Sequence, residues 1–420
     1  MNILLLLKLT FKSILNRRFT SYLTLFSICI SVFLLLSVDT IRKEAKHSFT
    51  DTISGTDLLV GARSGSVQLL LYSVFRIGNA TNNIGWDSYE KISSHSSVAW
   101  SIPISLGDSH KGFRVMGTSQ AYFEHYRFSD NQALEFNEGN AFSEVYDTVI
   151  GAEVAEKLGY QLGDKLTLAH GVYDTDFARH DDKPFILTGI LQRTGTPVDQ
   201  TIHVSLQGIE ALHIDWKTGA RSRQKVSAEQ ALELDLRPTQ ITAFMLGLKS
   251  KMDIFRVQRA INNYKKEPML AVLPGLALGE LWQLIGVAEK ALLIIAAFVL
   301  LNSFVGLLTV ILTSLNERRR EIAILRSLGC RPNQIFILLA SESLLFAIAG
   351  CFLGALLFFI AILFSQSMLQ GFGLNIPLSS FGSAQLVLIA AVIGVSFLIG
   401  IIPGYRAYKQ SLADGMSIKL

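Results

Sequence analysis

Four stretches of the chain are apolar and long enough to cross a membrane as helices. Phe19 to Val38 has 20 residues without a charge and Ala291 to Leu315 has 25, and about 20 residues suffice for a hydrocarbon layer of about 30 Å. Two further stretches follow, 338–366 with the single charge of Glu342 and 385–402 with none. Core helices of soluble proteins rarely run this far without a polar face. The pattern therefore predicts four transmembrane helices.

Basic residues gather on one side of these stretches. Of the 38 Lys and Arg residues, 12 lie in the short segments 1–18, 316–334 and 403–420, and none lies between the third and fourth apolar stretches. Because short cytoplasmic segments are enriched in Lys and Arg, these three segments are expected in the cytoplasm. The first stretch is too long for a secretion signal and no A-x-A-like cleavage site follows it, so we expect an uncleaved anchor.

The intervening segment 39–290 has the composition of a soluble domain outside the membrane. It holds the other 26 basic residues and, at about 250 residues, can form its own core. Alternating stretches predict strands and two periodic stretches predict helices: Phe113–Met116, Thr148–Ile150, Lys165–Leu168, Phe185–Leu191, Ile241–Leu248 and Met269–Leu273 as strands, Ala152–Leu158 (ended by Gly159) and Asp253–Tyr264 as helices. The prediction is an α+β domain inserted between the first two transmembrane helices, with two lobes divided near 218–227.

Both transmembrane helices next to this domain are expected to continue outward. Residues 41–53 follow the first apolar stretch without Gly or Pro, and 276–289 lead into the second. Two such stalk helices could transmit a push or a twist from the membrane to the external domain. Two ordinary linkers are the competing interpretation.

The cytoplasmic segment between the second and third apolar stretches predicts a short amphipathic helix. Glu317 to Leu328 are good helix formers, Gly329 supplies a C-terminal stop, and Pro332 follows. An apolar stripe recurs along it at i, i+3 and i+6, formed by Ile322, Leu325 and Leu328, while its ends carry charges. Such a helix can bind in a groove of a cytoplasmic partner. The arginines could alternatively serve only as a topology signal.

This segment resembles the coupling segment of ABC-transporter permeases of the MacB, LolC and FtsX type. The residues that match, and that the resemblance implies as the ATPase-coupling site, are Glu317, Arg318, Arg319, Arg320, Glu321, Ile322, Leu325, Arg326, Leu328 and Gly329. Ala323 stands where the family usually has Gly, and Ile324 also matches. Two further stretches, 147–164 and 403–407, are similar to the family as well.

The resemblance implies a mechanism in which the chain itself hydrolyses nothing. In such permeases two chains pair, a cytoplasmic ATPase docks on each coupling helix, and ATP-driven closure moves the external domains. No G-x-x-x-x-G-K-[ST] stretch occurs here, so ATP and Mg are expected in a partner ATPase and no cofactor in this chain. A homodimer is favoured over a heterodimer, and a periplasmic adaptor or lipoprotein is a possible further partner.

The implied cargo is amphipathic, such as a lipoprotein, a peptide or a hydrophobic compound, moved by mechanotransmission in release or efflux. The alternative is an FtsX-like signalling scaffold that transmits ATP-driven motion to an external enzyme. Relatives of that kind tend to have a smaller external domain, so the segment of about 250 residues favours transport. The expected location is the bacterial inner membrane, with the large domain in the periplasm.

Overall composition and cysteine positions agree with this assignment. Hydrophobic residues make up 50% and charged residues 17% of the chain, against about 25% charged in soluble domains, which argues against an ordinary cytosolic enzyme. The net charge of +4 gives no general argument for nucleic-acid binding. Cys29, Cys330 and Cys351 all lie outside the external domain, which therefore folds without disulfides.

Several weaker signals keep two interpretations each. Gly350 and Gly354 are four residues apart and predict close helix packing, either between chains or within one. Glu342 could pair with the coupling helix, snorkel to the interface, or serve a proton relay. The apolar run 67–75 could contact cargo or fill the domain core.

Histidines and aspartates crowd the segment 170–182 without a rigid metal-binding spacing. We expect no metal site, with His170, His180 and Asp181 as weak candidates and a solvated polar loop as the alternative.

Overall fold

The computed structural model describes residues 18–170, 180, 182–215, 226–317, 319–327, 329–370 and 381–409. The chain divides into two compact units, 1–45 with 286–420, and 46–285. Within the described residues, four helices are long and apolar enough to cross a membrane. The segments concerned are Arg18–Lys46, Pro274–Leu315, Pro332–Gln366 and Ser383–Arg406.

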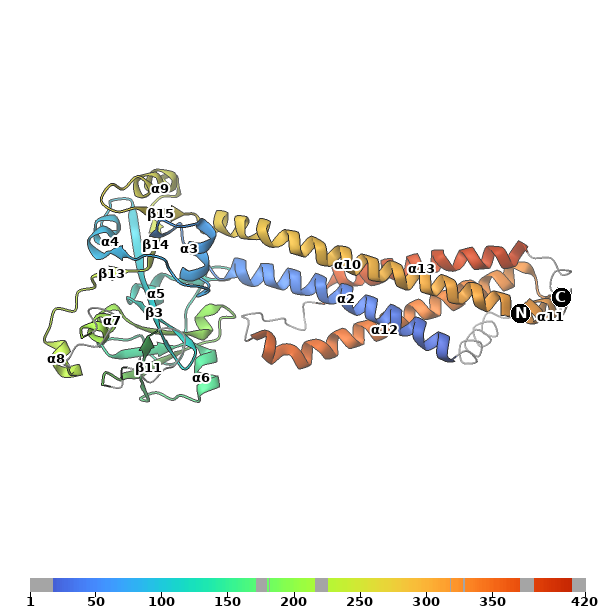
Figure 1. Cartoon of the computed structure of the whole chain (residues 1–420), viewed down its shortest axis with the longest axis horizontal. Helices are drawn as coiled ribbons and strands as arrows, with labels where there is room; N and C mark the ends of the chain where they lie inside the picture. Colours follow the sequence, from blue (N-terminus) through green and yellow to red (C-terminus); the bar gives the residue numbers. More distant parts are fainter. Residues whose placement is uncertain are drawn as a thin grey trace. The chain divides into compact units, whose positions relative to one another are not determined.

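The first unit is built from long helices (Figure 1). They are α2 (Arg18–Asp51), α10 (Pro274–Glu317), the short α11 (Arg319–Ser327), α12 (Pro332–Gln370) and α13 (Ser383–Lys409). Helices α2 and α10 continue without interruption into residues of the second unit. Pro332 begins α12, where the missing N–H of proline costs nothing because the first helical N–H groups have no partner within the helix.

Buried apolar side chains from all five helices form one cluster in this unit. Its members are Ile28, Val32, Leu36, Phe304, Leu307, Ile311, Leu315, Ile322, Ile335, Leu339, Phe346, Cys351, Phe358, Ile362 and Val392. Helix α13 continues through Pro403 to Lys409, beyond the expected end at 402.

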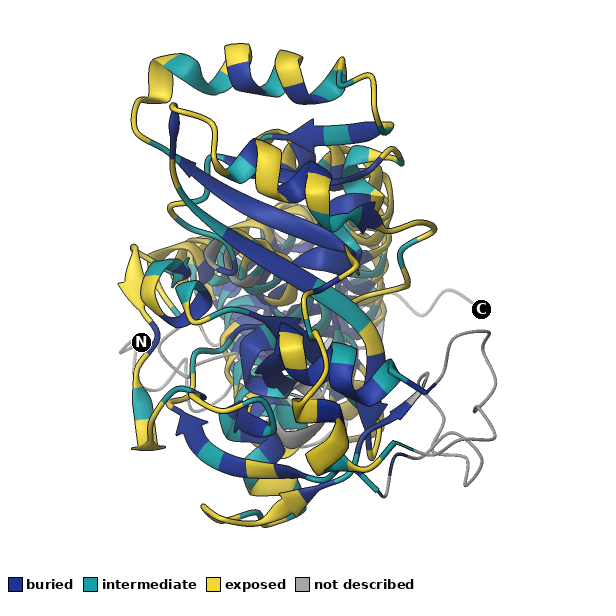
Figure 2. Ribbon diagram, turned by 90° about the vertical axis from the view of Figure 1, so that its left-hand side faces the viewer, coloured by how far each residue is buried: buried dark blue, intermediate teal, exposed yellow. Residues whose placement is uncertain are grey.

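The second unit is an α+β domain around one large mixed sheet. The strand order is β15-β1-β14-β3-β4-β12-β8-β11-β7, with β10 paired to β3 and β9 to β11. These strands are β1 (Leu58–Ala62), β3 (Val98–His110), β4 (Phe113–Thr118), β7 (Phe136–Gly139), β8 (Asp147–Ile150), β9 (Lys165–Leu166), β10 (Ala169–His170), β11 (Phe185–Leu191), β12 (Thr201–Ser205), β14 (Ala243–Leu248) and β15 (Met269–Val272). Most of their residues are buried, as the dark blue strands in Figure 2 show.

Short helices and two strand pairs complete this domain. The helices are α3 (Ser66–Ser73), α4 (Trp86–Ser93), α5 (Ala121–His125), α6 (Ala152–Leu158), α7 (Leu206–His213), α8 (Ala228–Leu232) and α9 (Ile254–Asn262), with 3-10 turns η2 (Pro197–Gln200) and η3 (Lys251–Asp253). Strand β2 (Ile84–Gly85) pairs with β13 (Gln240–Ile241), and β5 (Arg127–Phe128) with β6 (Gln132–Ala133). The predicted strand over 185–191 and the predicted helix over 152–158 are confirmed.

The predicted boundary between two lobes, near 218–227, lies mostly outside the described residues. Strand β3 pairs with β14 on one side and with β4 on the other, so a single sheet crosses the whole domain. The apolar run 67–75 falls mainly in α3, where Leu69 and Leu70 are fully buried. The domain core therefore accounts for this run.

Candidate functional site

The proposed coupling segment forms helix α11 between α10 and α12. It ends at Ser327, and Gly329 beyond it has φ 91°, a left-handed conformation that glycine adopts without strain. Ile322 and Ala323 are buried, whereas Ile324 is 59% exposed. Glu321 is exposed and Arg326 half-buried.

The remaining candidates of this segment lie wholly or partly outside the described residues. Arg318 and Leu328 lie outside the described residues, as do the side chains of Glu317, Arg319, Arg320 and Leu325. Ile322 belongs to the cluster that includes Leu315, Ile335 and Leu339. Its side chain therefore anchors α11 to the helical unit, and Ile324 is the apolar side chain that α11 leaves exposed among the described residues. The sequence pattern alone places Ile322 in one apolar stripe with Leu325 and Leu328.

Gly350 and Gly354 of α12 lie against α2 of the same chain. A Cβ atom added at Gly350 would come within 2.5 Å of Ile28 Cγ2, and one at Gly354 within 2.8 Å of the Cys29 carbonyl oxygen. Since both distances are below any normal contact, the absence of side chains is what lets these two helices approach.

Hydroxyl groups join α2 to α10 in the apolar part of the helices. The hydroxyl oxygens of Ser27 and Ser303 are 2.7 Å apart, and those of Ser31 and Ser303 are 2.6 Å apart. Ser303 also donates to the Ser27 carbonyl oxygen at 2.9 Å. Ser31 and Ser303 are buried, so this contact satisfies polar groups that would otherwise face hydrocarbon. Sequence reasoning missed it because three serines in uncharged runs give no pattern by themselves.

Charged groups link the same helices farther out. Arg42 of α2 forms an ion pair with Glu289 of α10. Lys43 Nζ lies 2.6 Å from Asp39 Oδ2 one turn earlier, and the same carboxylate oxygen accepts a bond from the Gln385 amide of α13 at 3.4 Å. The two helices are therefore fastened to each other at both the serines and the outer ion pair.

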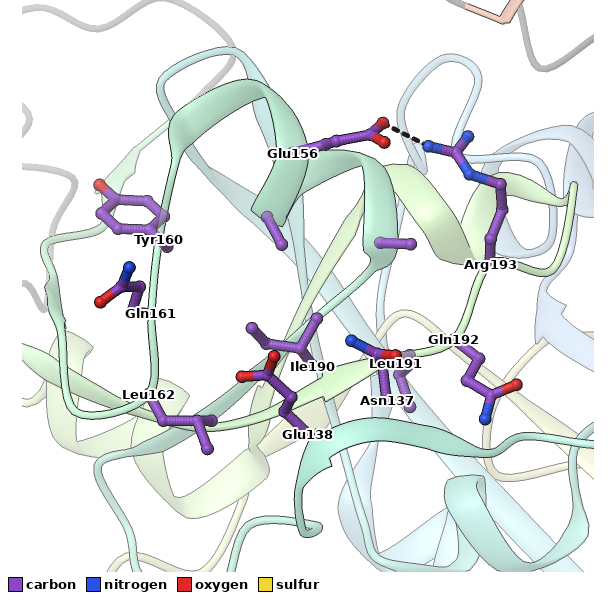
Figure 3. A pocket seen from close by; sticks show the side chains of 12 residues that line it. Asn137, Glu138, Glu156, Tyr160, Gln161, Leu162, Ile190, Leu191, Gln192 and Arg193 are labelled. Atoms are coloured by element: carbon purple, nitrogen blue, oxygen red, sulfur yellow. Dashed lines mark hydrogen bonds and ion pairs between the residues drawn. The ribbon is translucent and has the colours of Figure 1, made fainter.

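The external domain carries a groove of about 980 Å³ between α6, β7 and β11. Ile190 lies at its centre, and Glu156 and Arg193 form an ion pair across its rim (Figure 3). Glu138 and Gln161 add further polar groups to the lining. Among the described residues, no group of three or more potential metal ligands lines it.

The histidines of the domain do not assemble a metal site among the described residues. Asp181 and the side chain of His170 lie outside the description, and His180 is buried 5.8 Å from His213, measured between ring centroids. His203 is fully buried; burial and the nearby Arg76 charge lower its pKa to about 3. His203 is thus a neutral core residue at ordinary pH.

Comparison with known proteins matches both parts of the chain. Residues 21–264 match the MacB-like periplasmic core domain, and residues 293–412 match the C-terminal part of FtsX-like permeases. The chain belongs to the MacB/LolC/FtsX-type family of ABC-transporter permeases. The MacB-like match alone covers more than half of the 420 residues.

Individual relatives are distant. The lipoprotein-releasing system transmembrane protein LolC of Haemophilus influenzae is 24% identical over 306 residues, which are 69% of this chain and 70% of LolC. The periplasmic region of MacB from Actinobacillus actinomycetemcomitans aligns with 55% of this chain and 94% of its own length, at 10% identity and a TM-score of 0.33. The extracellular domain of the noncanonical ABC-type transporter YknZ from Gram-positive bacteria covers 52% of this chain and 99% of its own length, at 14% identity and a TM-score of 0.31.

Membership in this permease family fixes the location and the kind of subunit. The chain is a multi-pass inner-membrane protein with a periplasmic domain. Members are transmembrane subunits of ABC transporters, and the P-loop missing from this sequence is expected in a cytoplasmic ATPase partner.

Proposed function

We propose that this permease couples ATP hydrolysis in a separate ATPase subunit to motion of its periplasmic domain, and thereby moves amphipathic cargo. The observation that carries the proposal is the pair of uninterrupted helices α2 and α10. Each contains both membrane-spanning length and residues of the periplasmic unit. A helix without a break transmits displacement along its axis because every turn is hydrogen-bonded to the next.

Contacts between α2 and α10 support this transmission of motion. The hydroxyls of Ser31 and Ser303 and the Arg42–Glu289 ion pair join α2 to α10 at two levels. Two helices joined in this way resist sliding past each other, so displacement at the cytoplasmic end of α10 reaches both.

The ATPase would act on α11, which directly follows α10. The buried Ile322 fixes α11 to the helical unit, and the exposed Ile324 offers an apolar side chain to a groove on the partner. ATP and Mg would be bound by that partner. A second permease chain would complete the transporter, with a homodimer favoured.

Lipoprotein release is the cargo function that one relative's name suggests, since LolC is named for a lipoprotein-releasing system. The groove beside α6 has the size of a ligand site, about 980 Å³. Its mixed lining around Ile190 and the Glu156–Arg193 pair suits part of an amphipathic cargo or a periplasmic adaptor.

The docking step is tested by changing Ile324 to Asp in the full chain. Placing a charge at a buried apolar contact costs several kcal/mol, so the co-purified ATPase should fall at least about ten-fold at equal permease level. Ile324→Leu is the matched control, because it keeps an apolar side chain of the same size at the same position and should retain the ATPase. If Ile324→Asp binds the ATPase as the wild type does, α11 is not the docking element.

A further inference from the structure

The exposed face of α10 differs from that of α12. Between Ile295 and Thr313 it carries an amide, a glycine and two hydroxyls, all exposed within the chain: Asn302, Gly306, Thr309 and Thr313. On α12 the exposed positions between 343 and 366 are all apolar: Ile348, Phe352, Leu353, Leu356, Ile360, Leu363 and Phe364. A helix face that contacts only lipid is expected to resemble α12, because hydrocarbon offers no partner to polar groups.

Asn302 is the decisive residue on this face. It lies near the middle of the uncharged stretch 291–315, and none of the described residues hydrogen-bonds its side-chain amide. Thr309 satisfies its own hydroxyl by donating to the Val305 carbonyl oxygen at 2.8 Å. An amide has two donors and two acceptor lone pairs, which no atom of its own helix can satisfy together. A polar group at this depth therefore indicates a protein partner.

The neighbours of Asn302 form a continuous surface for another helix. Four residues advance about 400° around a helix of 3.6 residues per turn, so Phe298 and Gly306 lie on the same face as Asn302. Phe298 and Val305 are 66% and 55% exposed. A Cβ atom added at Gly306 would meet nothing within 4 Å, so a second backbone can approach closely there.

We propose that this face, centred on Asn302, is where α10 of a second copy of the same chain packs, with the two Asn302 amides hydrogen-bonded to each other. An amide is both donor and acceptor, so it is complementary to itself across a two-fold axis. A single asparagine in an apolar helix interface also fixes the register of the pair. This inference rests on the pairing of two chains in the proposed function and specifies which helix makes the contact.

Disulfide cross-linking of the full chain in membranes tests the contact. Asn302→Cys should give a covalent dimer on oxidation, because cysteines at a two-fold contact come within the few ångströms that a disulfide requires. Phe352→Cys on α12 is the matched control, since Phe352 is also exposed, at 67%. It should remain at the level of the wild-type chain, whose Cys29, Cys330 and Cys351 set the background. Equal cross-linking of both variants, or linkage of the Asn302→Cys variant to a different protein, overturns the proposal.

A non-covalent measurement separates the amide from the surrounding surface. In detergent, Asn302→Leu should weaken dimerisation about ten-fold, and Asn302→Gln should restore most of it because it retains the amide. An unchanged dimer with Asn302→Leu overturns the assigned role. Co-purification of the ATPase with the same variants is the readout for the proposed function. If the ATPase still binds and the chain still dimerises, only the Asn302 contact fails; if the wild-type chain binds no ATPase, the proposed function fails.

Discussion

Replacing Lys43 and Glu44 of α2 by glycine should uncouple the periplasmic domain from ATP hydrolysis. Both residues lie inside the helix Arg18–Asp51, between the Arg42–Glu289 ion pair and the first residue of the periplasmic unit, Lys46. Each glycine destabilises a helix interior by about 1 kcal/mol relative to alanine. Two of them cost about 2 kcal/mol, which raises the population of locally unwound helix about 30-fold.

The control is the alanine pair at the same two positions. It removes the same side chains, including the Lys43–Asp39 ion pair, which at a surface contributes at most about 1 kcal/mol. That loss is common to both variants, so the difference between them isolates helix stiffness. Amide hydrogen exchange across residues 40–46 should be about 30-fold faster in the glycine variant than in the alanine variant if unwinding limits exchange.

Transport and hydrolysis are then measured together. The glycine variant should assemble with its ATPase and hydrolyse ATP but lose the cellular task of the transporter, whereas the alanine variant should retain all three. If hydrogen exchange accelerates as expected and transport persists at the wild-type level, α2 only connects the two units, and the proposed transmission of motion through α2 is refuted.

Two further predictions concern packing and pH. Changing Gly350 and Gly354 together to alanine should lower the melting temperature of the full chain in detergent, because each added Cβ overlaps α2 at a cost of about 1–3 kcal/mol. The control is Gly394→Ala, which should be neutral or stabilising because nothing lies within 4 Å of the added atom. Equal effects of the two changes on the melting temperature would contradict the assigned packing. In the folded domain the pKa of His203 is lowered from 6.5 to about 3. Below pH 6.5 the unfolded chain therefore binds a proton at His203 that the folded chain does not bind. The free energy of unfolding should fall as the pH drops below 6.5, by up to about 1.4 kcal/mol per pH unit from this residue. Denaturant titrations at pH 7.5 and 5 check this, since His203→Gln should show a smaller loss than the wild type; equal losses would contradict a buried neutral His203.

Long-range patterns in the sequence anticipate the long helices and part of the sheet. Uncharged runs such as 19–38 and 291–315 predict apolar helices because length and hydropathy alone decide whether a segment can cross a bilayer. The stop of α6 at Gly159 is equally local: this residue has φ 67° and its N–H bonds to the Ala155 carbonyl.

Other features depend on tertiary contacts that no local pattern contains. Strand β3, the longest strand described, gave no signal because Pro103 and Gly107 interrupt its alternation and its pairing with β4 shifts register between Leu106 and Ser109. The sequence places Ile322 in an apolar stripe with Leu325 and Leu328, and only the packing of α11 into the buried cluster of the helical unit shows that Ile322 is buried. Asn302 lies in an uncharged run, and the local sequence does not show that it is exposed, because the packing of α10 in the chain decides which of its faces is exposed.

A separate ATPase is proposed to bind this chain at α11, and purification of the permease with its partners tests this most directly. The wild-type permease is purified from its native membrane in mild detergent, and its stoichiometric partners are identified and assayed for hydrolysis of MgATP. The account predicts one ATPase chain with a P-loop for each permease chain, released by Ile324→Asp and retained by Ile324→Leu. A permease that purifies without any ATPase, or one whose ATPase is indifferent to Ile324, would contradict it.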